Sequence, residues 1–268
     1  MIYNADCLSV MQDISDSSID MIYLDPPFYT QKKQSLSDSK GNRYEFSDVW
    51  DSLDEYLNFM RQRIAEMKRL LKPTGSIFLH CGTSASHHLR LLLDNIFGCE
   101  SFRSEIIWSY KRWSNSRKGL LPGHQTIFYY TKTQNYNFNT IYSEYSATTN
   151  VDQILQERKR DITGKAVYKR DNSGVIIEAK EKKGVPISDV WDIPFLNPKA
   201  KERTGYPTQK PIELLERIIK ISTNEGDTVL DPFCGSGTTL VSAKLLNRNY
   251  IGIDVNKDAV QITKSRLE

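Results

Sequence analysis

The segment 228–238 limits the fold of this chain more than any other feature. It reads Thr-Val-Leu-Asp-Pro-Phe-Cys-Gly-Ser-Gly-Thr, a short apolar strand that runs into a glycine-rich turn and then a helix. Glycine lets a backbone approach a ligand closely and adopt positive φ angles. One more strand, 250–253, follows, and two strands cannot bury the faces of a sheet. Strands from the start of the chain must therefore complete the sheet, in a circularly permuted order.

The start of the chain supplies candidate strands. Residues 19–24 form an apolar run that stops at two prolines, as a buried parallel strand does. We expect residues 1–5 to lie beside residues 250–253, with the strand 19–24 next. Residues 105–110 and 125–131 are too close in sequence for a crossover helix, so they predict an antiparallel pair. The sequence thus predicts an α/β sheet that is mostly parallel, with one antiparallel strand.

Helices are predicted where apolar residues recur at helical spacing. The clearest stripe runs from Leu53 to Leu71, and further helices are expected over about 84–97, 211–223, 238–247 and 257–267. Because these helices are spread along the whole chain, we expect them to cover both faces of the sheet. Residues 30–48 are polar and show no period, which predicts a long mobile loop.

The alternation of strands and helices divides the chain into three parts. It is lost over residues 135–203, which are polar, basic and interrupted by glycine and proline. We interpret this stretch as a small insertion between residues 1–134 and residues 204–268, which together form one domain. No internal repeat is apparent.

Composition excludes several classes of protein. Hydrophobic residues make up 39% of the 268 residues and charged residues 26%, which is enough to bury a core. No apolar run reaches the roughly 18 residues of a membrane span, and no secretory signal precedes the first strand. The four cysteines are scattered, which argues against a disulfide scaffold or a zinc module. These features predict a soluble cytoplasmic protein without a metal.

Charge is distributed unevenly along the chain. The stretch from Ser101 to Lys210 carries nearly twice as many basic as acidic residues, whereas the remainder is acidic overall. Within the basic stretch, cations alternate with aromatic rings, which is typical of proteins that bind phosphates and bases together. The candidate DNA-binding residues are Lys111, Arg112, Trp113, Arg117 and Lys118.

Acidic side chains at strand ends indicate the kind of cofactor. Asp254 follows the strand 250–253, about 20 residues after the glycines, where an acid can accept hydrogen bonds from ribose hydroxyls. Asp231, inside the turn, suits a positively charged cofactor better than a pyrophosphate. Asp6 follows the first strand, so we expect it at the same edge of the sheet as Asp254.

A second turn, Asp25-Pro26-Pro27-Phe28, follows the strand 19–24. Its two prolines carry no N–H groups, so the turn offers acceptors, namely the Asp25 carboxylate and the Pro26 carbonyl. Phe28 adds a flat apolar face beside them. Two acceptors next to a flat ring match an exocyclic amine on a planar base.

Together these motifs resemble the amino-directed, S-adenosylmethionine-dependent DNA methyltransferases in their β-class motif order. Residues 25–28 are similar to the catalytic motif of that family, and residues 231–238 to its cofactor motif. Residues 206–211 (Tyr-Pro-Thr-Gln-Lys-Pro) resemble the motif before it, residues 4–7 the segment on the adenine side of the cofactor, and Asp254 the ribose-binding acid. The resemblance covers most of the chain outside about 135–195. It implies a circularly permuted, Rossmann-like methyltransferase sheet in which residues 135–203 are a target-recognition insertion.

The resemblance also implies a reaction. A methyl group would pass from S-adenosylmethionine to the N6 amine of an adenine flipped out of double-stranded DNA. Asp25 and Pro26 would accept the hydrogens of the amine, Phe28 would stack on the base, and Pro27 completes the motif. The cofactor-binding residues would be Asp6, Cys7, Lys210, Asp231, Phe233, Gly235, Ser236, Gly237, Thr238 and Asp254. Such an enzyme would be the modification enzyme of a restriction-modification system. Its possible partners, besides DNA, would be a companion restriction endonuclease and a second copy of the chain in a homodimer.

Four other functions compete with adenine methylation. Cytosine-N4 methylation acts on the same kind of amine, although enzymes of that type more often resemble Ser-Pro-Pro at the catalytic turn. RNA or protein-glutamine methylation is a weaker alternative, since the latter enzymes usually resemble Asn-Pro-Pro-Tyr. A catalytically silent DNA-binding subunit would use the basic insertion alone, and the intact Asp25 and glycine turn argue against it.

Some reactive side chains are interpreted as structural. His80 and Cys81 end a predicted strand, and His87 and His88 begin a helix, but none shows the spacing of a metal site. Cys234 lies inside the glycine turn without a basic neighbour, so we expect a small apolar filler.

Overall fold

A computed structural model describes residues 1–37, 43–111, 118–145, 154–178, 183–197 and 200–268. The chain divides into two compact units. The first contains Met1–Asn139 and Asp189–Glu268, and the second contains Thr140–Ser188.

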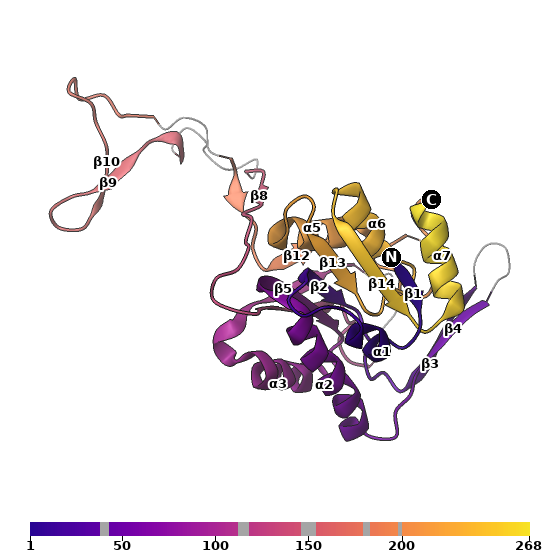
Figure 1. Cartoon of the computed structure of the whole chain (residues 1–268). Coiled ribbons are helices and arrows are strands. Elements are labelled where there is room, and N and C mark those ends of the chain that lie inside the picture. The colour runs from indigo at the N-terminus through magenta and orange to yellow at the C-terminus, as the bar shows by residue number, and fades with distance from the viewer. Residues whose placement is uncertain (38–42, 112–117, 146–153, 179–182, 198–199) are drawn as a thin grey trace. The chain divides into compact units, whose positions relative to one another are not determined.

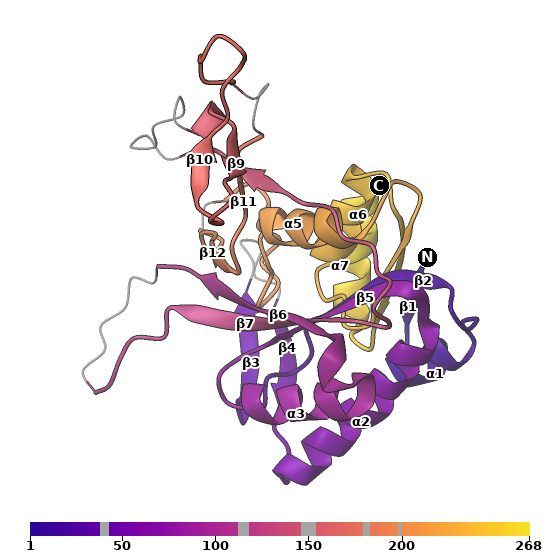
Figure 2. The same ribbon diagram turned by 90° about the vertical axis from the view of Figure 1, so that its left-hand side faces the viewer.

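The first unit is built on an eight-stranded sheet in the order β1-β14-β13-β2-β5-β7-β6-β12 (Figures 1 and 2). Its strands are β1 (Ile2–Asn4), β2 (Ile19–Leu24), β5 (Leu71–Cys81), β6 (Phe102–Ser109), β7 (His124–Thr131), β12 (Val190–Asp192), β13 (Thr228–Asp231) and β14 (Asn249–Asp254). Among these described strands only β7 is antiparallel to its neighbours. The predicted sheet, including the antiparallel pair that became β6 and β7, is confirmed.

The order of the strands also confirms the circular permutation, with one correction. β1 pairs with β14, as predicted, but β2 lies beside β13 and not beside β1. All six residues of β2 are buried, so this strand needs a partner on both edges, and β13 and β5 supply them. The partly exposed β1 occupies the edge of the sheet.

In the described part of the first unit, α-helices cover both faces of the sheet (Figures 1 and 2). On one face lie α1 (Cys7–Gln12), α2 (Leu53–Leu70) and α3 (Ser86–Phe97), and on the other α5 (Ile212–Ser222), α6 (Thr238–Leu245) and α7 (Lys257–Leu267). A short 3₁₀ helix, Cys99–Ser101, follows α3. None of the helices in the described part of the chain is both long and apolar enough to cross a lipid bilayer.

The helix α2 shows how the sequence sets these elements. Ser52 accepts a hydrogen bond from the Glu55 amide at 3.1 Å and so caps the first turn. Acidic residues occupy that turn and basic residues the last, which complements the helix dipole. On the apolar stripe of α2, Met60, Ile64 and Met67 are fully buried in the main core, to which residues of β2 and β5 also belong. Leu53 and Leu57, in the first two turns, are partly buried against it.

Most of the described residues between 30 and 48 form strands, where an irregular loop was predicted. β3 (Lys32–Ser37) and β4 (Arg43–Asp48) pair as an antiparallel hairpin. The predicted absence of a period was wrong, because part of the segment has the two-residue period of a strand. Two aromatic residues, Tyr44 and Phe46, alternate in the sequence with polar ones, which is the pattern of a strand.

The second unit is shorter than the insertion predicted over residues 135–203. It contains two small antiparallel pairs, β8 (Tyr142–Ser143) with β11 (Val185–Pro186), and β9 (Arg158–Arg160) with β10 (Ala166–Tyr168). Residues 189–203 belong to the first unit, because β12 extends the main sheet alongside β6.

Candidate active site

A cavity of about 790 Å³ lies where the carboxyl ends of the central parallel strands meet. The residues that follow β1, β2, β13 and β14 line it, and so does the segment 206–210 that leads to α5. Parallel strands bring their carboxyl ends to one edge of a sheet, which is why segments far apart in the sequence meet here. The volume is typical of a pocket for a small organic ligand.

The glycine turn forms one wall of the cavity. Gly235 and Gly237 have φ angles of 49° and 75°. A Cβ atom on Gly237 would lie 2.5 Å from Cγ2 of Thr263, so glycine is required there for space as well as for conformation. Gly237 also begins α6, whose N-terminus therefore faces the turn. Of the residues predicted in this turn, Gly237 alone does not line the cavity within the described structure.

Two acids hold the glycine turn in place. Asp231, which is buried, accepts hydrogen bonds from the Phe233 amide at 3.0 Å and from Oγ1 of Thr239 at 2.5 Å. Burial raises the pKa of Asp231 to about 7, and the nearby acids add to this effect while the two hydrogen bonds oppose it. Asp254 accepts from the Gly235 amide at 2.8 Å, and burial raises its pKa as well.

Asp6 lines the cavity beside Cys7, at the start of α1. Its carboxylate accepts from the Leu8 amide at 2.9 Å and from the Arg63 guanidinium at 2.5 Å. Arg63 is nearly buried and stacks over the Phe59 ring at 3.5 Å. Arg63 was not among the residues predicted from the sequence. The available signal was a charged residue on the apolar stripe of α2.

The catalytic turn predicted at residues 25–28 forms the opposite wall. The Asp25 side chain is 17% exposed, and Lys210 donates a hydrogen bond to its Oδ2 atom. The Oδ1 atom is buried and has no hydrogen-bond partner in the described part of the chain. Burial raises the pKa of Asp25, and the Lys210 ammonium opposes that shift. Lys210, predicted to bind the cofactor, lines the cavity but is paired with this acid.

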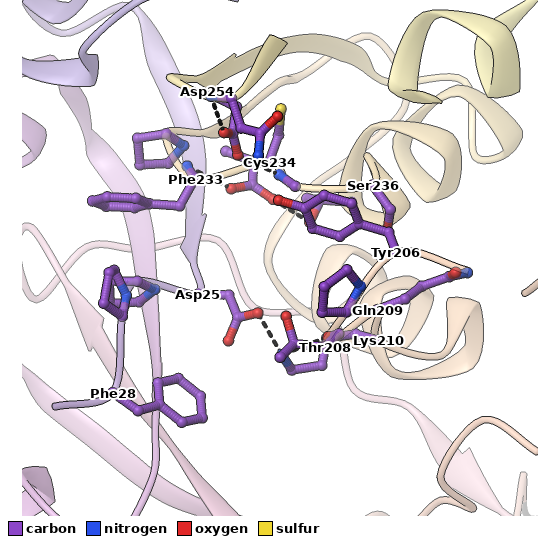
Figure 3. A pocket seen from close by; sticks show the side chains of 18 of the residues that line it. Asp25, Phe28, Tyr206, Thr208, Gln209, Lys210, Phe233, Cys234, Ser236 and Asp254 are labelled. Atoms are coloured by element: carbon purple, nitrogen blue, oxygen red, sulfur yellow. Dashed lines mark hydrogen bonds and ion pairs between the residues drawn. The ribbon is translucent and has the colours of Figure 1, made fainter. Parts of the chain in front are cut away.

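Figure 3 draws Asp25 between two ends of the cavity, with Phe28 on one side and Phe233 and Asp254 on the other. Pro26 and Pro27 also line the cavity, and the Tyr56 hydroxyl donates to the Pro27 carbonyl at 2.9 Å. Residues of the predicted catalytic turn and of the predicted cofactor turn therefore line the same cavity.

His80 lies closer to this turn than its structural interpretation suggested. The fully buried imidazole has its Nδ1 atom 2.7 Å from the Tyr23 hydroxyl and 3.6 Å from Asp25 Oδ1, and its ring centroid is 5.5 Å from that of Phe28. Burial and the Lys210 charge hold its pKa well below the usual range, so the ring is neutral. The position of His80 at the end of a strand could have indicated this, because β5 pairs with β2 and places His80 next to Asp25.

The remaining predicted residues belong either to the glycine turn or to the basic stretch after β6. Ser236 and Thr238 line the cavity and accept hydrogen bonds from Arg266 on α7. Cys234 is buried, and burial raises its pKa well above the ordinary value. Lys111 and Lys118 are exposed, whereas Arg112, Trp113 and Arg117 lie outside the described residues.

Comparison with known proteins places these motifs in a family. A family model described as DNA methylase (N6/N4 methyltransferase) matches residues 19–265. The type II methyltransferase M.HpaI of Haemophilus parainfluenzae is 31% identical over 98% of this chain and 73% of its own length. The DNA adenine methyltransferase YhdJ of Escherichia coli K12 is 30% identical over 100% of this chain and 82% of its own.

A solved structure shares the fold. The M1.HpyAVI–SAM complex superposes with a TM-score of 0.61 and 23% identity, covering 100% of this chain and 98% of the other. The topology, the two turns at one sheet edge and the match over residues 19–265 agree with one another. The chain belongs to the N6/N4 DNA methylase family.

Proposed function

We propose that this protein transfers a methyl group from S-adenosylmethionine to the N6 amine of an adenine flipped out of double-stranded DNA. The observation that carries the proposal is the Asp25 carboxylate. It shares one cavity with the glycine turn and Asp254, and its Oδ1 atom is a buried acceptor without a hydrogen-bond partner in the described chain. The similarity to the type II methyltransferase M.HpaI and to the DNA adenine methyltransferase YhdJ supports DNA methylation, and the similarity to YhdJ supports adenine as the target.

The glycine turn and its acids fit the cofactor. Glycine at positions 235 and 237 lets the turn adopt positive φ angles, and Gly235 lines the cavity. Asp254 retains lone pairs beyond the two amides that it accepts. Asp6, Cys7 and Phe233 would complete the walls around the cofactor. The cofactor supplies an electrophilic methyl group on a sulfonium centre.

The protein's own groups activate the amine. Lys210 holds Oδ2 of Asp25, so Oδ1 would accept one hydrogen of the amine and the Pro26 carbonyl the other. Accepting both hydrogens localises the nitrogen lone pair, and the carboxylate offsets the positive charge that develops on nitrogen. Phe28 would stack on the base, and the cavity would hold the two reactants in contact.

The exposed Lys111 and Lys118 would contact DNA phosphates together with Arg112 and Arg117, and Trp113 would contact bases. The insertion predicted over residues 135–203 would read the target sequence. A companion restriction endonuclease, a homodimer and a cytoplasmic location remain predictions.

The decisive experiment identifies the modified nucleoside. Amplified bacterial genomic DNA, which carries no methylation, is incubated with the protein and labelled S-adenosylmethionine, then digested to nucleosides and separated. We expect the label in N6-methyladenine, and none with the Asp25→Ala variant. Label in N4-methylcytosine would replace adenine by cytosine as the target, and no label in either nucleoside would contradict the proposal.

A further inference from the structure

Asp48, the last residue of β4, is a buried acid that the proposed mechanism does not use. Its Oδ2 atom accepts from the Phe28 amide at 3.2 Å, the Thr30 amide at 2.8 Å and the Thr30 hydroxyl at 2.6 Å. Its Oδ1 atom accepts from the Tyr29 amide at 3.0 Å and from Nε1 of Trp50 at 3.1 Å. One carboxylate therefore binds three successive amides directly after the catalytic turn.

Those amides converge because the backbone adopts an unusual conformation. Tyr29 has a φ angle of 59° and Gln31 one of 55°, in the left-handed region that side chains other than glycine disfavour. Backbone in such conformations presents successive N–H groups to one anion, and it persists only where the surroundings enforce it. Asp48 is the anion that enforces it here.

Asp48 also lines the cavity, but the protein itself takes up the hydrogen-bonding capacity of its carboxylate. A carboxylate offers about four lone-pair sites, and Asp48 already accepts from five donors. No capacity is left for a substrate. Any effect of Asp48 must therefore pass through the turn that it binds.

The group that this turn orients is the Phe28 ring. A Cβ atom on Gly82 would lie 3.1 Å from the ring, so the backbone at Gly82 packs directly against it. His80 and the Lys210 ammonium lie at 5.5 Å and 5.6 Å from the ring centroid. Gly82, His80 and Lys210 surround the Phe28 ring, and Asp48 binds the Phe28 amide. These contacts fix the orientation of the ring before a base binds.

We propose that Asp48 is a positioning residue, which fixes the backbone of residues 28–30 so that Phe28 is presented to the target base. This inference rests on the proposed function of Phe28 as the stacking partner. Asp48 also ends the hairpin whose residues Lys32 and Ser47 line the cavity, so the same carboxylate joins the hairpin to the catalytic turn.

The test compares Asp48→Asn with Asp51→Asn, an exposed acid on the same segment, in the full-length protein. The asparagine keeps the shape of the side chain but replaces one acceptor with a donor that faces N–H groups. We expect faster amide hydrogen exchange in peptides covering residues 28–30 of the Asp48→Asn variant. With cofactor and amplified genomic DNA both at saturating concentration, kcat of the Asp48→Asn variant should fall about tenfold to a hundredfold. The dissociation constant for S-adenosylmethionine should change little, and Asp51→Asn should match the wild type in all three.

A second pair of variants covers the case in which Asp48→Asn does not fold. Thr30→Val removes one donor to Asp48, and Thr30→Ser keeps it. We expect kcat to fall several-fold in Thr30→Val and to stay near wild type in Thr30→Ser, with unchanged cofactor affinity in both.

The outcomes separate this inference from the proposed function. An active wild type whose Asp48→Asn variant keeps normal kcat, or shows unchanged exchange at residues 28–30, overturns the role of Asp48 alone. A loss of cofactor affinity equal to the loss of kcat would make Asp48 merely structural. A wild type that methylates no nucleoside would remove the proposed function and this role with it.

Discussion

The Lys210 ammonium donates a hydrogen bond to the Oδ2 atom of Asp25, although 185 positions of sequence separate the two residues. This contact joins the predicted catalytic turn, residues 25–28, to the segment before α5, and the second oxygen of Asp25 has no hydrogen-bond partner among the described residues. It also opposes the effect of burial, because a nearby cation favours the ionised acid.

Replacing Lys210 should therefore change the pH dependence of the reaction. Burial raises the pKa of Asp25, and loss of the cation in Lys210→Met would raise it further. Because the ionised carboxylate accepts the amine, the acid limb of kcat/KM against pH should move to higher pH. Lys220→Met, which removes a more exposed lysine on α5, should leave the profile in place. An acid limb that does not move would show that Lys210 does not control Asp25.

Asp25→Ala and Asp254→Ala should fail in different ways. The Asp25 variant should lose methyl transfer and keep cofactor affinity within a few-fold of wild type, because the carboxylate acts mainly on the transition state. The Asp254 variant should bind the cofactor more weakly, at a cost on the order of 1–3 kcal/mol for lost acceptors. Turnover measured across a cofactor titration separates them. Rescue of the Asp25 variant by high cofactor concentration would contradict its assignment to the chemistry.

Asp231 should make the folding stability depend on pH. Its pKa is about 7 in the folded protein and 3.8 for a free side chain, so between these values the folded state holds a proton that the unfolded state has released. The contribution of Asp231 to the free energy of unfolding should then fall as pH rises from about 4 to 7, and level off above. Asp231→Asn lacks this contribution. Urea unfolding at several pH values should show the variant gaining on the wild type across that window, and parallel curves would refute it.

Gly237→Ala tests the packing of the glycine turn. Both Gly237 and Gly226 have positive φ angles, 75° and 84°, but a Cβ on Gly226 meets nothing within 4 Å, whereas one on Gly237 meets Thr263. Each substitution should cost about 1–2 kcal/mol for the backbone, and Gly237→Ala should cost more because of the clash. Thermal unfolding and cofactor calorimetry measure both effects. Equal losses in the two variants would mean that Thr263 can move aside.

The parts of the site that the sequence predicted are those with a local signature. An apolar strand followed by prolines or glycines identifies residues 25–28 and 231–238 without knowledge of the fold, and their chain order indicates the permutation. Both turns line one cavity in the structure.

The parts that the sequence did not predict depend on contacts between distant elements. Asp6 and Arg63 are separated by 57 positions, as are Tyr23 and His80, and each pair meets only because the elements that carry them pack together. Asp48 was not predicted because it belongs to a segment that was interpreted as a loop. The amides that its carboxylate binds lie 18 to 20 residues away in the sequence. Polar residues of this kind show no periodicity, and their partners are fixed by the tertiary fold.

The place of β13 between β14 and β2 has a consequence for biosynthesis. As the chain leaves the ribosome, β2 emerges about 200 residues before the strand that covers one of its edges, and Asp25 emerges long before Asp231. A nascent chain with an open, apolar central strand is prone to pair with other chains until β13 arrives. We therefore expect that cofactor capture cannot begin during synthesis of the first three quarters of the protein.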